Sequence, residues 1–304
     1  MEYVLTTSAL SKTYRKFEAL KDLTMHIPKG AIYGFVGRNG AGKTTLIRVI
    51  CGLQEPTSGE YAIYGISNKD RQISKSRHRM GAVVETPSIY LDMTAEDNLR
   101  QQALVLGLPS YESISEILKL VGLENTGKKK ARNFSLGMKQ RLGIAVALIG
   151  NPDFVVLDEP INGLDPQGIA EMREIIHRLS KERGITVIVS SHILDELAKV
   201  ADAFGIINDG KLIDEFTADE LNERCARHIM LKTGDVDGCR RVLAEVGISA
   251  YDLLENGDIR INEEISDTSS LIASLVGAGV PVYELATVQT TLEQYFLNCL
   301  GGGV

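Results

Sequence analysis

The feature that most constrains this sequence is a glycine-rich segment, GRNGAGKTT, which follows a short apolar run and precedes an apolar helical stretch. Gly37, Gly42, Lys43 and Thr44 have the spacing of a phosphate-binding loop in its strand–loop–helix setting. The N–H groups of such a loop point at phosphate oxygens, and the helix that follows adds the positive end of its dipole. Lys43 supplies a charge to the β- and γ-phosphates, and Thr44 offers a hydroxyl to magnesium. The residues expected to bind the nucleotide are Gly37, Arg38, Asn39, Gly40, Ala41, Gly42, Lys43, Thr44 and Thr45.

Two acidic residues extend this site. The segment FVVLDEP places Asp158 at the end of an apolar strand and Glu159 directly after it. Carboxylate oxygen is a ligand that Mg²⁺ prefers, so Asp158 is expected to hold the metal together with Thr44. Glu159 is then the candidate base for an attacking water. An apolar strand that ends in two acids is common, and the phosphate loop upstream gives this one its functional interpretation.

The order of apolar segments predicts an α/β fold. Near-continuous apolar runs occur at Ala31–Val36, Phe154–Leu157 and Ile185–Ser190, with helical periodicity between them. Buried strands that alternate with helices are typical of a parallel sheet covered on both faces. Helical periodicity from about 87 to 150 predicts a helical arm, and we expect a first domain at 1–218.

The remaining residues, 219–304, are expected to form a small α+β accessory domain. Helices are predicted at Asp237–Val246 and Thr268–Gly277, and a hairpin is predicted around Asn256–Gly257. From Leu221 to the end there are 6 basic and 12 acidic residues, so this part carries most of the net charge of −7. It contains no catalytic cluster, which favours a regulatory or dimer-bracing role. The glycines at 301–303 are expected to form a loose tail.

Charge and cysteine content argue against several classes of protein. The excess of 40 acidic over 33 basic residues argues against sequence-independent binding of nucleic acid, which depends on phosphate neutralisation. The four cysteines form no Cys-x-x-Cys pair, so they support neither a zinc site nor a redox motif. The longest apolar stretch, Leu142–Gly150, is far shorter than the ~20 residues of a membrane helix, and the N-terminus lacks a signal-peptide core. We expect a chain that neither crosses a membrane nor is exported by itself.

Further motifs in the chain carry a family resemblance. NGLDP at 162–166 is similar to the D-loop of ATP-binding cassettes, with Asp165 as its acid, and SSH ends at His192 in the position of the family's switch histidine. FSLGMKQRL is similar to the family's LSGGQ signature, and its central residues are Ser135, Leu136, Gly137, Met138, Lys139 and Gln140. Together with the phosphate loop and LDEP, these motifs cover roughly residues 2–215. The chain resembles the nucleotide-binding subunit of an ATP-binding cassette (ABC) transporter, in particular drug and peptide-antibiotic exporters of the bacitracin and lantibiotic type.

This resemblance implies a parallel core sheet, an antiparallel β layer and a helical arm, with ATP and Mg²⁺ as ligands. It implies catalytic roles for Lys43, Glu159 and His192, and stacking of Tyr14 on adenine. ATP would lie between the phosphate loop of one subunit and the signature of a second copy or a paralogue. The local sequence supports this role, because Ser135–Gly137 precede an apolar helix whose N-terminus suits an anion. Without the other motifs, Ser135 would be an ordinary helix N-cap.

Glu85 departs from the family pattern, which usually has glutamine at this turn. Glutamine offers the magnesium ion and the attacking water one oxygen, whereas Glu85 adds a negative charge beside the γ-phosphate. It follows the apolar strand Ala82–Val84 and precedes Pro87, so it lies at the end of a strand, where ligand groups gather. We expect Glu85 to be a metal ligand with Thr44 and Asp158. The alternatives are a contact to a membrane partner or a plain surface acid.

The function expected from these observations is ATP hydrolysis that powers transport, by separate transmembrane permease subunits, of a drug or antimicrobial peptide. The chain would lie in the cytoplasm, peripheral on the inner face of the cell membrane. The competing class is an ABC-type ATPase that is not coupled to transport, such as a cofactor-assembly subunit. One phosphate loop argues against tandem translation factors, and the absence of long heptads argues against repair ATPases.

Overall fold

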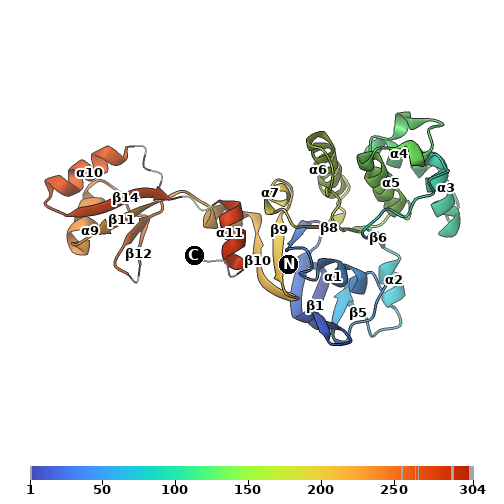
Figure 1. Ribbon diagram of the computed structural model, residues 1–304, viewed down its shortest axis with the longest axis horizontal. Coiled ribbons are helices and arrows are strands. Elements are labelled where there is room, and N and C mark those ends of the chain that lie inside the picture. Colours follow the sequence, from blue (N-terminus) through green and yellow to red (C-terminus); the bar gives the residue numbers. More distant parts are fainter. Residues whose placement is uncertain (1, 255, 264, 266, 289–290, 301–304) are drawn as a thin grey trace. The chain divides into compact units, whose positions relative to one another are not determined.

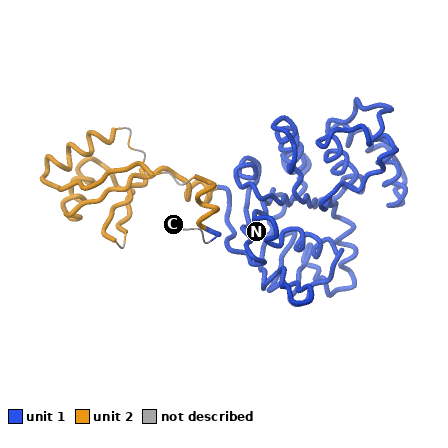
Figure 2. Tube along the Cα trace, in the orientation of Figure 1, with its two compact units in different colours: residues 1–218, 299–302, 304 blue, residues 219–298, 303 orange. Residues whose placement is uncertain are grey.

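The computed structural model describes all residues except 1, 255, 264, 266, 289–290 and 301–304. The described residues form two compact units, one of residues 2–218 together with 299–300 and the other within residues 219–298 (Figure 2). The glycines at 301–303, for which the sequence predicts a loose tail, lie outside the described residues. Within the described part, no helix has both the length and the apolar character needed to span a bilayer.

The first unit is built on a six-stranded sheet with the order β10-β9-β3-β8-β7-β6 (Figure 1). Its strands are β3 (Ile32–Val36), β6 (Met80–Val83), β7 (Phe154–Leu157), β8 (Thr186–Ser191), β9 (Ala203–Asn208) and β10 (Lys211–Thr217). All pairs are parallel except β9–β10. Every residue of β3, β7 and β8 is buried, which confirms the parallel core predicted from their near-continuous apolar runs.

Two strands of this sheet were not predicted. The segment AFGIIN forms β9 beside β3, and Asp209–Gly210 turns the chain into β10. The signal was present, because an apolar run followed by Asp-Gly is a strong hairpin pattern. β9 matters for the site, because Ile207 lies against Gly37 and Gly42 of the glycine-rich loop.

A second, four-stranded antiparallel sheet lies in the same unit, with the order β2-β1-β4-β5. Its strands are β1 (Tyr3–Tyr14), β2 (Phe17–Pro28), β4 (Ser58–Ile63) and β5 (Ile66–Ser67). Leu5, Leu20 and Tyr61 from this layer share one buried apolar cluster with Leu46 and Ile50 of α1 (Lys43–Ile50). The cluster fixes the helix that starts at the glycine-rich loop.

Helices make up the rest of the first unit. Between β6 and β7 lie α3 (Ala95–Val105), α4 (Ser113–Leu120) and α5 (Leu136–Leu148), with two short 3₁₀ turns at Glu124–Thr126 and Ala131–Asn133. Thr94 begins α3 with a capping box, in which its hydroxyl accepts from the N–H of Asp97. The remaining helices are α2 (Ile73–Arg77), α6 (Pro166–Lys181) and α7 (Leu194–Leu197). The predicted α/β class with an antiparallel layer and a helical arm is confirmed.

The second unit has its own sheet and core. Its antiparallel strands have the order β12-β13-β11-β14 and span Tyr251–Leu253 (β12), Ile259–Ile261 (β13), His228–Thr233 (β11) and Val282–Val288 (β14). Its helices are α8 (Ala218–Arg224), α9 (Val236–Glu245), α10 (Thr268–Gly277) and α11 (Leu292–Cys299). Leu231, Leu243 and Leu275 are fully buried in a core separate from that of the first unit.

Candidate functional site

The glycine-rich loop wraps the ammonium group of Lys43. Its Nζ donates to the carbonyl oxygen of Gly37 at 2.6 Å and to that of Arg38 at 3.2 Å. Gly42 is the N-cap of α1 with φ of 113°, and a Cβ there would lie 2.7 Å from the carbonyl oxygen of Ala19. A side chain at Gly42 would therefore clash with backbone, which is why the loop needs glycine at this position. The loop places a buried cation beside the N-terminus of α1.

Asp158, at the end of β7, is held from two sides. Its Oδ2 accepts from the hydroxyl of Thr44 at 2.9 Å, and its Oδ1 accepts from the hydroxyl of Ser190 at 2.6 Å. Ser190 lies in the neighbouring strand β8 and is fully buried. The same serine oxygen accepts the N–H of Glu159 at 2.8 Å, so one hydroxyl orients both acidic residues. Ser190 was not predicted from the sequence, although it stands in the SSH segment at the end of β8.

Glu159 contacts both other predicted catalytic residues. Its Oε2 lies 2.9 Å from Nδ1 of His192, and its Oε1 lies 3.1 Å from Nζ of Lys43. Glu159 adopts φ of +50°, a left-handed conformation that costs a non-glycine residue about 1–2 kcal/mol. The Lys43 contact is a charge pair without hydrogen-bond geometry, and Glu159 Oε1 is buried with no hydrogen-bond partner. A buried oxygen of this kind fits a site that receives a further polar group.

A cavity of about 330 Å³ lies over the loop. It is lined by Phe17, Ala19, Asn39, Gly40, Gly42, Lys43, Thr44, Thr45 and Glu159. Phe17 is the aromatic residue in this lining, and 64% of its surface is exposed. Tyr14, proposed to meet adenine, is 38% exposed at the end of β1 and bonds the side chain of Gln54 through its hydroxyl. Sequence reasoning missed Phe17, which stands only three residues after Tyr14.

The signature and the D-loop lie together in a different cavity. Ser135 is the N-cap of α5 and accepts the N–H of Met138 at 3.2 Å, while Asp165 is the N-cap of α6 and accepts the N–H of Gly168 at 2.9 Å. The signature residues Ser135, Leu136, Gly137 and Met138 line a cavity of about 450 Å³ that also contains Asp165. Lys139 and the buried Gln140 follow on α5. This cavity shares no lining residue with the one over the phosphate loop.

Glu85 lies two residues after β6, and its side chain forms an ion pair with Arg48. Arg48 Nη2 donates to Glu85 Oε1 at 2.6 Å, and both side chains are partly exposed. Like Glu159, Glu85 has a left-handed backbone, with φ of +61°. The structure therefore brings Thr44 and Asp158 together but pairs Glu85 with Arg48. A metal role for Glu85 stays a prediction.

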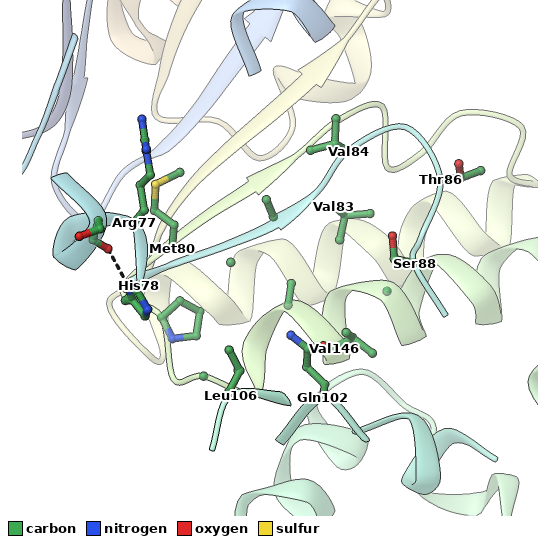
Figure 3. Close-up of a pocket in the computed structure, with 17 residues that line it drawn as sticks. Arg77, His78, Met80, Val83, Val84, Thr86, Ser88, Gln102, Leu106 and Val146 are labelled. Carbon is green, nitrogen blue, oxygen red and sulfur yellow. Dashed lines mark hydrogen bonds between the residues drawn. The ribbon is translucent and has the colours of Figure 1, made fainter. Parts of the chain in front are cut away.

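A groove of about 490 Å³ separates the sheet edge from the helical arm. Val83, Val84 and Thr86 line one side, and Leu106 and Val146 line the other (Figure 3). His78, at the end of α2, is held there by a contact of 2.6 Å between its Nδ1 and the carbonyl oxygen of Ser74. The lining is mostly apolar, and the Glu85 turn passes directly beside it.

Known proteins resemble this chain over its whole length. The family model described as ABC transporter matches residues 20–162. The chain is 40% identical over 304 residues to the bacitracin transport ATP-binding protein BcrA of Bacillus licheniformis, covering 100% of this chain and 99% of the relative. It is 43% identical over 212 residues to the lantibiotic transport ATP-binding protein SrtF of Streptococcus pyogenes, covering 70% of this chain and 90% of the relative.

Solved structures show the same cassette. The chain matches cbiO1 of Clostridium perfringens, part of the ABC transporter complex cbiONQ, with a TM-score of 0.67 and 27% identity over 81% of this chain and 96% of that chain. It matches the dimeric cassette MJ0796 bound to ADP and Pi with a TM-score of 0.63 and 26% identity over 70% of this chain and 98% of that one.

Fold and site thus define a nucleotide-hydrolysing protein with a phosphate loop. The chain belongs to the ABC transporter family, as one of its ATP-binding subunits. It is an ATPase, and ATP and Mg²⁺ are its ligands. The residues fit the metal, because Thr44 and Asp158 present adjacent oxygens and magnesium takes its other ligands from phosphates and water. The described residues contain no cluster of three His, Cys, Asp or Glu side chains that would hold a metal without the nucleotide.

Proposed function

We propose that this chain powers the export of a peptide antibiotic of the bacitracin or lantibiotic kind through separate transmembrane subunits. The observation that carries the proposal is the length of the match to the bacitracin transport protein, which covers 100% of this chain and so includes the second unit. The solved cassettes, by contrast, cover 70% and 81% of this chain. The second unit is therefore a feature that this chain shares with the bacitracin transport subunit, whereas the match to the lantibiotic transport subunit covers 70% of this chain.

In this proposal the chain's own residues divide the work of hydrolysis. The loop and Lys43 would hold the phosphates, and Thr44 and Asp158 would hold the metal, which would neutralise phosphate charge. Glu159 accepts the proton of the attacking water, because its Oε1 is buried, has no hydrogen-bond partner and lines the loop cavity. His192 orients Glu159 through its 2.9 Å contact. Tyr14, with Phe17 beside it in sequence, stacks on the adenine.

A second chain completes the site. The signature cavity and the loop cavity share no residue, so the anion-binding N-terminus of α5 serves a nucleotide held by a partner. The partner is a second copy or a paralogue, and Asp165 lies on the same face as the signature.

The groove beside Glu85 is the proposed seat of the permease, and it would hold the chain at the inner face of the membrane. Its lining joins the edge of the core sheet to the helical arm, so a segment seated there contacts both. The chain binds the membrane through this partner alone in the proposal, since no described helix could span the bilayer.

The test is co-expression of this chain with a membrane subunit encoded beside it, in an antibiotic-sensitive bacterium. Resistance to bacitracin or a lantibiotic is expected with the wild-type chain and should be lost with Glu159→Gln. A second variant, Val146→Asp, puts a charge into the groove and should release the chain from membranes while its ATPase activity persists. Mg²⁺-dependent ATPase activity without any change in resistance would refute the export role and favour an ATPase not coupled to transport.

A further inference from the structure

Arg48 has no role in the cassette motifs, yet it makes the closest polar contact of Glu85. The two side chains meet at 2.6 Å, with Arg48 36% exposed and Glu85 54% exposed. Arg48 lies in the last turn of α1, the helix that begins at Lys43. The contact therefore joins the phosphate-loop helix to the turn that follows β6.

The Arg48 contact lies on the same helix as Thr44, one of the two proposed metal-binding residues. Thr44 and Arg48 are four residues apart, so they lie on one face of the helix about 6 Å apart along its axis. Thr44 bonds Asp158 at 2.9 Å, which marks the place of the metal. Glu85 pairs with Arg48 and is not among the residues that line the cavity over the phosphate loop.

We propose that Arg48 is a positioning residue for Glu85, holding its carboxylate away from the magnesium site in competition with the metal. The inference rests on the proposed function, because it presumes that the nucleotide and Mg²⁺ bind where the loop and Asp158 place them. The left-handed backbone of Glu85, with φ of +61°, supports it, since such a conformation in a residue other than glycine persists where the surroundings impose it. Arg48 fixes one oxygen of Glu85, Oε1, and its positive charge repels a cation that the same carboxylate would ligate, so the arginine and the metal compete for Glu85.

The consequence is an energetic coupling between Arg48 and metal affinity that passes through Glu85. Removing Arg48 frees Glu85 for the metal, so the bound nucleotide should hold the cation more tightly. Removing a positive charge also favours any nearby cation directly, and that contribution does not depend on Glu85. A double-mutant cycle separates the two effects.

The probe is Mn²⁺ binding to the chain saturated with the non-hydrolysable ATP analogue AMP-PNP, followed by electron paramagnetic resonance. Arg48→Met, which keeps an apolar stem of similar length, should raise Mn²⁺ affinity. The fold-increase in Mn²⁺ affinity caused by Arg48→Met should be about 1.5- to 5-fold greater when Glu85 is present than in the Glu85→Gln background. This range is the one expected for coupling between partly exposed charges. Arg48→Lys keeps the charge and should stay close to the wild type.

Arg100→Met is the matched control, because Arg100 forms a pair of the same length, 2.6 Å, and similar exposure with Glu96 on α3. It should leave Mn²⁺ affinity unchanged. Equal effects of Arg48→Met in both backgrounds, or an equal effect of Arg100→Met, would overturn the role of Arg48. Failure of the wild-type chain to bind AMP-PNP at all would instead overturn the proposed function, and this inference with it.

Discussion

Nζ of Lys43 lies 3.1 Å from Oε1 of Glu159, so the cation that receives the phosphates and the proposed base contact one another directly. Lys43 is 5% exposed and Glu159 19%, which makes this a largely desolvated pair. A phosphate that enters the loop competes with Glu159 for the ammonium group and is repelled by the carboxylate. We therefore expect the pair to influence ATP affinity as well as the hydrolysis step.

Glu159→Gln is expected to bind ATP more tightly than the wild type while its hydrolysis rate falls by about 10²–10⁴-fold, because the base is lost. A dimer should accumulate with ATP and Mg²⁺. Fluorescent-nucleotide titration, a phosphate-release assay and size-exclusion chromatography measure the three effects. Hydrolysis at the wild-type rate would place the base elsewhere.

Lys43→Ala is expected to weaken ATP binding by about 10- to 150-fold, the equivalent of one charge-assisted contact. The substitution also leaves the carbonyl oxygens of Gly37 and Arg38 without their donor. Titration with a fluorescent ATP analogue checks this. Lys199→Ala, which removes an exposed lysine paired with Glu196, is the control and should bind like the wild type. Unchanged affinity of Lys43→Ala would remove this residue from the site.

Ser190→Ala should lower ATPase activity by about 10- to 100-fold, the usual cost of losing a group that orients metal ligands. It deprives Asp158 Oδ1 of a donor and the N–H of Glu159 of an acceptor. The Mg²⁺ concentration for half-maximal activity should rise. Ser191→Ala is a matched control, because Ser191 is equally buried and its hydroxyl accepts from the N–H of Ile193, outside the pair of acidic residues. If both variants lose activity equally, the effect is one of packing.

The buried hydroxyl of Tyr33 is expected to make the free energy of unfolding depend on pH. It is fully buried on β3 and donates to Glu215 Oε1 at 2.7 Å; burial, followed by the Glu215 charge, raises its pKa well above the usual value. The unfolded chain releases this proton near pH 10 and the folded chain does not, so stability is present below that pH and falls above it. The slope is about 1.4 kcal/mol per pH unit for one group.

Tyr33→Phe should therefore cost about 1–3 kcal/mol at pH 7, through the lost hydrogen bond to a charged acceptor, but flatten the decline above about pH 10. Urea unfolding between pH 7 and 11 measures both effects. The exposed Tyr3→Phe is the control and should keep the wild-type slope. Parallel pH profiles of stability for the wild type and Tyr33→Phe would show that Tyr33 does not cause the decline at high pH.

Local sequence alone determined much of this protein. The loop from Gly37 to Thr45 needs glycine where its backbone turns left-handed. The near-continuous apolar runs of β3, β7 and β8, and the two acidic residues that follow β7, were predictable from the sequence. The family and the ATPase activity followed from motifs in order. β9 was missed because its short run lies beyond the last recognised motif.

Only the tertiary structure decided which side chains meet. Ser190 and Glu159 are 31 residues apart, and their contact depends on the pairing of β7 with β8. Arg48 and Glu85 are 37 residues apart, and no spacing rule connects an exposed helix face with a strand-end turn. Spacing in sequence reports contacts within one helix or strand, whereas contacts between elements are set by packing of the apolar core, which fixes the register of every strand end. The candidate site residues could therefore be proposed from the sequence, whereas the contact between Glu85 and Arg48 could not.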